Sequence, residues 1–227
     1  TGEEPLTLAV QENRLVQVPG ADWVASIGAA DVVLLGEHHD QPDDHALELQ
    51  IVQKLYENAQ RSRRPLSVGL EMFQQRFQPV LDKYIAGEID DQQLYRDTEW
   101  SKRWFWPYEP YLPIFQFCRK AGVRLVALNA DNETLGKVER GGLEELQPEE
   151  WKQYIPDRDG FAKMGSMPEF KSYLRAVVVP SYKMHEQMGI LKMTVSGQVL
   201  DEPMTLKHFV AGRLLWDESM AGAAVKA

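Results

Sequence analysis

The stretch Leu66-Ser67-Val68-Gly69-Leu70-Glu71-Met72-Phe73 predicts a strand over 66–70 that is followed directly by a carboxylate. The next segment predicts a helix that stops near Gly87, with one apolar face formed by Phe77, Val80, Leu81, Tyr84 and Ile85. A further helix before Gly122 has an inner stripe of Tyr111, Ile114, Phe115 and Cys118. Residues 123–128 then predict another strand.

Upstream of this stretch, Val32-Val33-Leu34-Leu35-Gly36 predicts an earlier strand, of the kind that is buried on both faces in a parallel sheet. Asp43 and Asp44 offer N-caps for the helix that follows it. Strands and helices therefore alternate along the first half of the chain. This order indicates an α/β fold with a mostly parallel sheet flanked by helices.

The second half of the chain has a different pattern. Pro148 and Pro168 each begin a predicted helix, and a last helix is predicted from about Pro203 onward. Residues 189–203 are expected to connect the helix that begins at Pro168 to this last helix, with a small hairpin around Gly197. We expect one domain over residues 1–227, with an α/β core at 1–145 and a mainly helical subdomain at 146–227.

Composition limits the classes of function. The 227 residues carry a formal net charge of −9, which argues against nucleic acid as the main partner, because no basic excess can replace condensed counterions. Cys118 is the single cysteine of the sequence, which excludes an intrachain disulfide and a cysteine-rich zinc site. No apolar run approaches the roughly 18 residues of a membrane-spanning helix. The chain begins at Thr1, and the absence of a signal sequence sets no location.

Polar residues follow all three predicted strands. Ligands of parallel sheets bind beyond the carboxyl ends of the strands, so four side chains are expected to converge: Glu37, His39, Glu71 and Asn129. Of these, Glu37, His39 and Glu71 could serve as general base and orienting groups, or as ligands of a divalent metal. Alternatively, the two glutamates cap helices or pair with Arg76. Three neighbouring residues are expected to cap and solvate the first helix: Asp40, Asp44 and His45.

Aromatic residues are dense between positions 100 and 111, where the sequence has Trp100, Trp104, Phe105, Trp106, Tyr108 and Tyr111. Such a cluster can line a flat hydrophobic ligand, dock a partner, contact a membrane surface or fill a core. A porphyrin would also need an axial ligand, for which Tyr182 and nearby methionines are chemically eligible. The predicted cofactor-binding residues are Tyr108, Tyr111, His185 and Trp104.

Together these residues resemble the ChaN-like haem-binding family, whose wider superfamily includes Tiki-type metalloproteases and erythromycin-esterase-like hydrolases. The similarity covers about residues 31–221 and keeps the order and spacing of the family's motifs. The matching segments are 33–40, 69–73, Gln78, 81–84, 127–130, 141–143 and 215–221.

The resemblance implies haem, or another tetrapyrrole, as the ligand and a role in iron, haem or pigment handling. In the family, haem can lie at a dimer interface with tyrosine as an iron ligand, and bacterial members are commonly iron-regulated lipoproteins. The resemblance therefore predicts a haem-binding, membrane-associated protein that forms a homodimer. The bacterial cell envelope and the plastid are the two expected locations.

Two other functions stay open at this point. The superfamily motif Gly-x-x-His and its following glutamate carry over to Glu37, His39 and Glu71, which makes a metal-dependent hydrolase or peptidase the first alternative. The second is an interaction module that docks its Trp-rich segment onto a membrane protein or a photosynthetic complex.

The family pattern is incomplete at the end of the chain. Relatives carry a second Gly-x-x-His, whereas His185 and His208 have Tyr182 and Thr205 three residues earlier. Either the chain is truncated at its C-terminus or those residues belong to another segment. The missing motif makes an enzymatic function the less favoured expectation.

Overall fold

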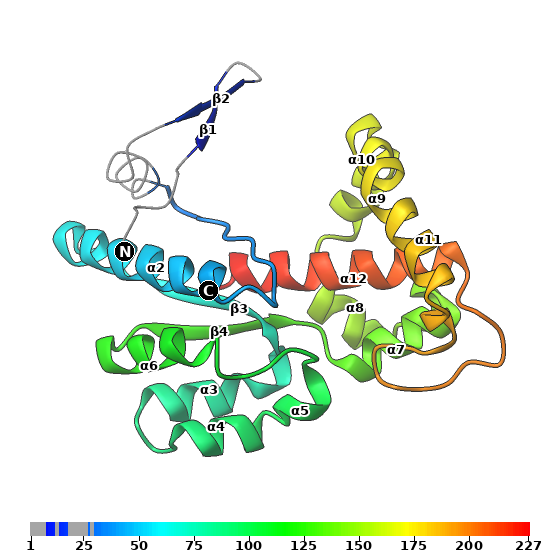
Figure 1. The fold of residues 1–227 in the computed structure, drawn as a ribbon. Helices are drawn as coiled ribbons and strands as arrows, with labels where there is room; N and C mark the ends of the chain where they lie inside the picture. The colour runs from blue at the N-terminus through cyan, green and yellow to red at the C-terminus, as the bar shows by residue number, and fades with distance from the viewer. Residues whose placement is uncertain (1–7, 12–13, 18–26, 28–29) are drawn as a thin grey trace. The chain divides into compact units, whose positions relative to one another are not determined.

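The computed structural model describes residues 8–11, 14–17, 27 and 30–227 (Figure 1). The chain divides into two compact units, and each is described by itself. The first unit comprises Thr1–Val68, Ile85–Gly87 and Trp106–Arg124, and the second comprises Gly69–Tyr84, Glu88–Phe105 and Leu125–Ala227.

The first unit is built around two helices, α2 (Pro42–Ser62) and α6 (Leu112–Ala121). Proline at the first helical position starts α2, because the missing N–H group would have no partner there. Helix α6 ends at Gly122, which adopts the left-handed conformation with φ +66°. The two helices pack together, with the rings of Tyr56 and Phe117 edge to face at 5.7 Å. This unit also contains an antiparallel hairpin of β1 (Leu8–Gln11) and β2 (Arg14–Gln17).

The second unit contains a small parallel sheet of β3 (Ser67–Gln74) and β4 (Arg124–Asn129). Parallel strands need a long crossover connection, and the chain between these two strands is largely helical. Besides α6, its elements are η1 (Gln75–Phe77), α3 (Gln78–Ile85), α4 (Asp91–Asp97) and α5 (Trp100–Arg103). Helix α4 begins with a capping box, in which Asp90 and Gln93 satisfy each other's backbone N–H groups.

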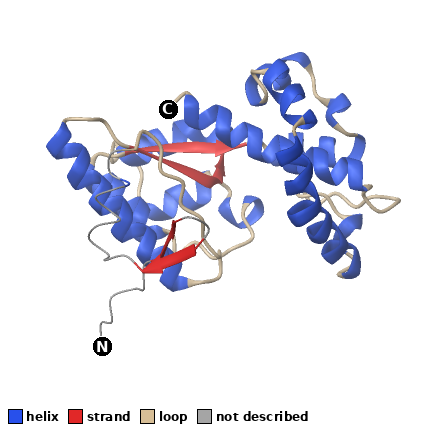
Figure 2. Cartoon of the chain, turned by 90° about the horizontal axis from the view of Figure 1, so that it is seen from above, coloured by secondary structure: helices blue, strands red, loops and turns tan. Residues whose placement is uncertain are grey.

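After β4 the described chain is mainly helical (Figure 2). The elements are α7 (Asn132–Gly141), η2 (Leu143–Glu145), α8 (Pro148–Tyr154), α9 (Arg158–Ser166), α10 (Pro168–Tyr173), the π-helix η3 (Leu174–Val178), α11 (Val179–Gln187), η4 (Ile190–Lys192) and α12 (Leu206–Val225). Helix α12 packs on α7 and α8, and a buried apolar cluster fills this contact. A second cluster joins Phe209 of α12 to Val178 and Leu191.

Most of the predicted elements are confirmed. The strands predicted at 66–70 and 123–128 are β3 and β4, and the helices predicted before Gly87 and Gly122 are α3 and α6. The expected hairpin also forms, because Met193 and Val199 make an antiparallel bridge and Gly197 has φ +79°. The predicted α/β class, with a parallel sheet flanked by helices, is correct. The predicted division at residue 145 stays a prediction.

The strand predicted at residues 32–35 is wrong. The structure assigns no strand to these residues, and Val32 and Leu34 are 66% and 90% exposed. Apolar residues favour a strand only where a neighbouring strand supplies hydrogen bonds and a packed face. Among the described residues, no strand pairs with this segment, so it has no such ladder. None of the helices that the structure describes is long and apolar enough to cross a membrane.

Candidate functional site

Glu37 is the centre of a cluster in the first unit, termed the acid–histidine cluster, formed by Glu37, His39, His45, Glu48 and Tyr111. The carboxylate Oε1 of Glu37 lies 2.6 Å from His39 Nδ1 and accepts a hydrogen bond from the Tyr111 hydroxyl at 2.9 Å. Its Oε2 lies 2.8 Å from His45 Nδ1. The predicted pair of Glu37 and His39 is thus in direct contact, and two further groups surround it.

His45 is buried, with 2% of its side chain exposed, so the prediction that it solvates α2 is wrong. Its Nε2 lies 3.1 Å from the carbonyl oxygen of His39. A carbonyl only accepts hydrogen bonds, so Nε2 carries the proton in this contact. The reason for burial is position, since His45, Glu48 and Val52 follow helical spacing on one face of α2.

Glu48 completes the cluster, with its Oε2 3.8 Å from His45 Nδ1. Burial raises the pKa of Glu48 from its ordinary value of 4.5 to about 8, and the nearby charge of Glu37 acts in the same direction. Sequence reasoning missed Glu48. The spacing of three residues between His45 and Glu48 could have indicated that they share a helix face. A polar pair on the first turns of a helix is, however, more often exposed to solvent.

Aromatic rings cover this cluster. The Trp106 ring lies 5.5 Å from the His39 ring, and the Tyr111 ring meets His45 edge to face at 4.4 Å. Tyr108 and Tyr111, two predicted cofactor-binding residues, are buried with 8% and 1% exposure. Their rings therefore serve as packing groups in this conformation, and the Tyr111 hydroxyl serves as a hydrogen-bond donor to Glu37.

Glu71 forms a separate cluster in the second unit. Strand β3 continues to Gln74, so Glu71 lies within the strand and not after it. Its Oε1 accepts a 2.7 Å hydrogen bond from the indole N–H of Trp216, and its main-chain oxygen accepts one of 3.0 Å from Asn129 Nδ2. The ring of Trp104, another predicted cofactor-binding residue, lies 6.5 Å from that of Trp216.

The expected pairing of Arg76 with a glutamate of the site is wrong. Arg76 instead lies 3.4 Å from Asp131 and 3.2 Å from Glu133, at the start of α7. Glu71 and Asn129 meet as adjacent parallel strands predict. The convergence of this pair with Glu37 and His39 stays a prediction.

His185, the last predicted cofactor-binding residue, lies on α11 in the second unit. Its Nδ1 is 2.8 Å from the carbonyl oxygen of Ser181, and its ring contacts Phe209 at 5.2 Å. Exposed apolar side chains lie along the same helical run: Tyr173, Val177, Met184 and Met188, at 40%, 51%, 50% and 62% exposure. These four residues and His185, whose ring packs against Phe209 of α12, are together termed the α11 face.

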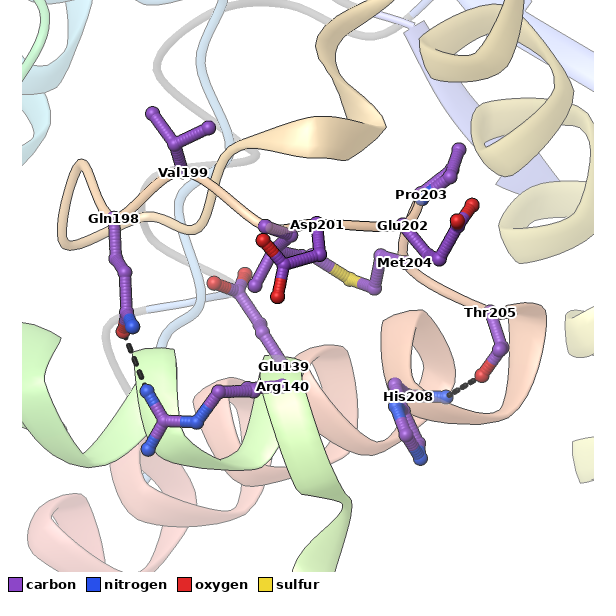
Figure 3. Close-up of a pocket in the computed structure, with 11 residues that line it drawn as sticks. Glu139, Arg140, Gln198, Val199, Asp201, Glu202, Pro203, Met204, Thr205 and His208 are labelled. Atoms are coloured by element: carbon purple, nitrogen blue, oxygen red, sulfur yellow. Dashed lines mark hydrogen bonds between the residues drawn. The ribbon is translucent and has the colours of Figure 1, made fainter.

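A pocket of about 340 Å³ also lies in the second unit, and Figure 3 shows its lining residues. Glu139 and Arg140 of α7 line one side, and residues 198–205 and His208 complete it. Arg140 donates a hydrogen bond to Gln198 across the pocket. The predicted site residues lie elsewhere, and no sequence pattern indicated this pocket.

The fold and these clusters define the class: an α/β protein in which histidine and tyrosine hold the carboxylate of Glu37, and tryptophan holds that of Glu71 on β3. The sequence matches the family described as haem-binding uptake, Tiki superfamily, ChaN, over residues 23–227. The chain belongs to that family, which confirms the predicted resemblance.

Two known proteins are similar to the chain. One is a solved structure described as cofacial heme binding to ChaN of Campylobacter jejuni, which matches with a TM-score of 0.64 and 21% identity. The match covers 93% of this chain and 72% of the Campylobacter chain. At this identity the likeness shows the fold alone. Protein RETICULATA-RELATED 5, chloroplastic, of Arabidopsis thaliana is 33% identical over 177 residues, or 76% of this chain. The chain spans 22% of that relative's length.

Proposed function

We propose that the chain binds haem or a related tetrapyrrole through the α11 face, with His185 as the iron ligand. The observation that carries this proposal is the orientation of the imidazole. The Ser181 carbonyl, one helical turn earlier, accepts only a protonated Nδ1, so Nε2 keeps its lone pair in the neutral ring. A histidine whose other nitrogen donates to a carbonyl is the usual arrangement of a metal-ligating imidazole.

The surroundings of His185 suit a porphyrin. A tetrapyrrole needs an apolar surface for its flat face, and Met188, which lies three residues after His185 and so beside it on the helix, is 62% exposed. The propionate groups of haem need cations, and the helical run from α10 to α11 carries three exposed ones: Lys171, Arg175 and Lys183. The membership of the chain in a haem-binding family agrees with this chemistry.

Tyr108 and Tyr111 are the alternative iron ligands, because tyrosine can also bind haem iron. Both would have to leave buried positions, and Tyr111 would give up its hydrogen bond to Glu37. This cost favours His185, whose ring is only partly buried.

A haemin titration followed by the Soret band tests the proposal. We expect a saturable shift with one haem per chain, and at least about tenfold weaker binding in His185→Ala. His208→Ala is the matched control, because it removes a partly buried histidine of α12 that lies outside the α11 face. No saturable shift for the wild-type chain would overturn haem binding.

The variants also separate the alternatives. If His185→Ala binds as the wild type does while Tyr108→Phe or Tyr111→Phe loses the shift, the ligand is tyrosine and the α11 face is not the site. Glu71→Ala should bind haemin normally, whereas a hydrolase that uses Glu37, His39 and Glu71 would lose turnover of a test ester in this variant.

We also propose a plastid location and a role in tetrapyrrole handling there. The support is the 33% identity to a relative whose name places it in the chloroplast. Import of the chain's precursor into isolated chloroplasts, followed by protease protection, tests the location. A chain that stays outside the organelle would contradict it.

A further inference from the structure

The geometry points to a divalent metal site in the acid–histidine cluster, with Glu37, His45 and Glu48 as its ligands. This site goes beyond haem binding, and its ligands differ from the predicted set of Glu37, His39 and Glu71. One ligand atom from each of the three side chains lies within 4.8 Å of the others. Metal–ligand bonds of about 2.0–2.2 Å keep two ligands of one ion within about 4.4 Å of each other. His45 Nδ1 meets this limit with Glu37 Oε2 at 2.8 Å and with Glu48 Oε2 at 3.8 Å.

The two oxygens of Glu37 have different surroundings. Its Oε1 is fully used by His39 Nδ1 and the Tyr111 hydroxyl, at 2.6 and 2.9 Å. Its Oε2 is buried and has no hydrogen-bond partner. Outer groups that hold one carboxylate oxygen and leave the other open are typical of metal-ligating carboxylates.

The side chain of His45 is 2% exposed. Because its Nε2 donates to the His39 carbonyl oxygen, the lone pair of the neutral ring is on Nδ1. This Nδ1 also lacks a hydrogen-bond partner, although it lies 2.8 Å from Glu37 Oε2 and 3.8 Å from Glu48 Oε2. Electron-rich atoms this close need a shared positive charge, which is either a proton or a metal ion.

The donor set indicates the class of ion. One imidazole and two carboxylates suit zinc, manganese or ferrous iron, whereas magnesium prefers oxygen ligands and retains its water. A thiolate is not available, because Cys118 is buried and burial raises its pKa to about 12. The open coordination positions would be filled by water.

Calorimetric titration of the chelator-treated chain with zinc tests the proposal, and cobalt gives a spectroscopic signature of the ligands. We expect one zinc per chain, cobalt absorption bands typical of nitrogen and oxygen ligands, and much weaker binding of magnesium. Glu48→Gln and His45→Gln should each weaken zinc binding at least tenfold. Glu57→Gln is the matched control on the same helix, because Glu57 is exposed and pairs with Lys54.

Each outcome decides the question. His38 and Asp44 form an exposed pair 3.0 Å apart, which could bind zinc at the surface. Unchanged zinc binding in His38→Ala would exclude this surface site. Zinc binding that is unchanged in Glu48→Gln and His45→Gln would overturn the proposal. So would the absence of zinc, cobalt or manganese binding to the wild-type chain at millimolar concentration, which would assign a proton to the cluster. If a variant does not fold, the wild-type cobalt spectrum and a zinc-dependent rise in Tm still decide.

Discussion

Glu139 on α7 holds the 193–199 hairpin through a carboxylate that is largely buried. Its Oε2 accepts a 2.7 Å hydrogen bond from the backbone N–H of Val195. Burial raises the pKa of Glu139, and this effect outweighs the Val195 hydrogen bond and the charge of Arg213, which lower it. The folded chain therefore holds a proton on Glu139 at a pH where the unfolded chain has already released it.

This pKa shift ties the free energy of unfolding to pH. Where the folded state binds more protons than the unfolded state, stability falls as the pH rises, from the ordinary pKa of a glutamate up to the raised value in the folded chain. We expect Glu139→Gln, which can still accept from Val195, to remove this loss. Its stability relative to the wild type should rise from acidic to neutral pH, as urea unfolding at a series of pH values would measure.

The control for this prediction is Glu88→Gln, which changes an exposed carboxylate in the same way. Its stability should follow the pH dependence of the wild type. Equal pH profiles for Glu139→Gln and the wild type would contradict a raised pKa at position 139.

At the same scale, the sequence predicted part of the site. Glu37 and His39 are two residues apart, and side chains with that spacing share one side of an extended segment, so their contact could be expected. The role of His45 could not, because it depends on where α2 begins. With Pro42 at the first helical position, His45 falls on the buried face. The Asp43 and Asp44 caps expected from the sequence imply a later start.

At the scale of elements, a helix side chain completes the edge of a strand. Gln78 on α3 accepts a hydrogen bond from the backbone N–H of Ala127 and donates one to the carbonyl of Leu125, both at 2.8 Å. These are two main-chain groups of β4 that a neighbouring strand would otherwise satisfy. A single amide therefore stands in for part of a strand ladder.

We expect Gln78→Leu to destabilise the chain by about 2 kcal/mol, because it leaves an N–H and a carbonyl of β4 without partners. Urea unfolding measures this difference. Gln92→Leu is the control, since it makes the same change at an exposed position of α4. Equal unfolding midpoints for the two variants would show that the Gln78 contacts contribute no net stability.

Elements with local signals were predictable, and elements that need distant partners were not. Helix α6 and strand β4 have their own apolar patterns, and Gly122 separates them by a left-handed turn. The apolar run at 32–35 has an equally clear pattern, yet it forms no strand, because strand pairing is a property of two segments. The π-helix η3 between α10 and α11 also carries no sequence signal.

At the scale of the whole molecule, charge and exposed apolar surface oppose each other. A formal net charge of −9 repels a second copy of the chain, and salt screens this repulsion. The α11 face exposes apolar side chains to water, and burying such a surface against a second copy favours association. If His185 binds one face of a haem, the other porphyrin face adds to this area. Self-association should then depend on haem, because only the loaded chain presents enough apolar surface to overcome the charge.

We therefore expect haemin to convert the chain from monomer to dimer. Dimerisation should need less protein in 0.5 M than in 0.05 M salt, because tenfold more salt shortens the screening length about threefold and weakens the repulsion. Light scattering after size exclusion measures the mass of both forms. His185→Ala should remain monomeric with haemin, and the haem-free chain should be monomeric at both salt concentrations.

A loaded chain that stays monomeric would reject the dimer while leaving haem binding intact, because the Soret titration measures binding separately. A dimer favoured by low salt would instead indicate charge pairing between copies, and the apolar α11 face could not be its interface.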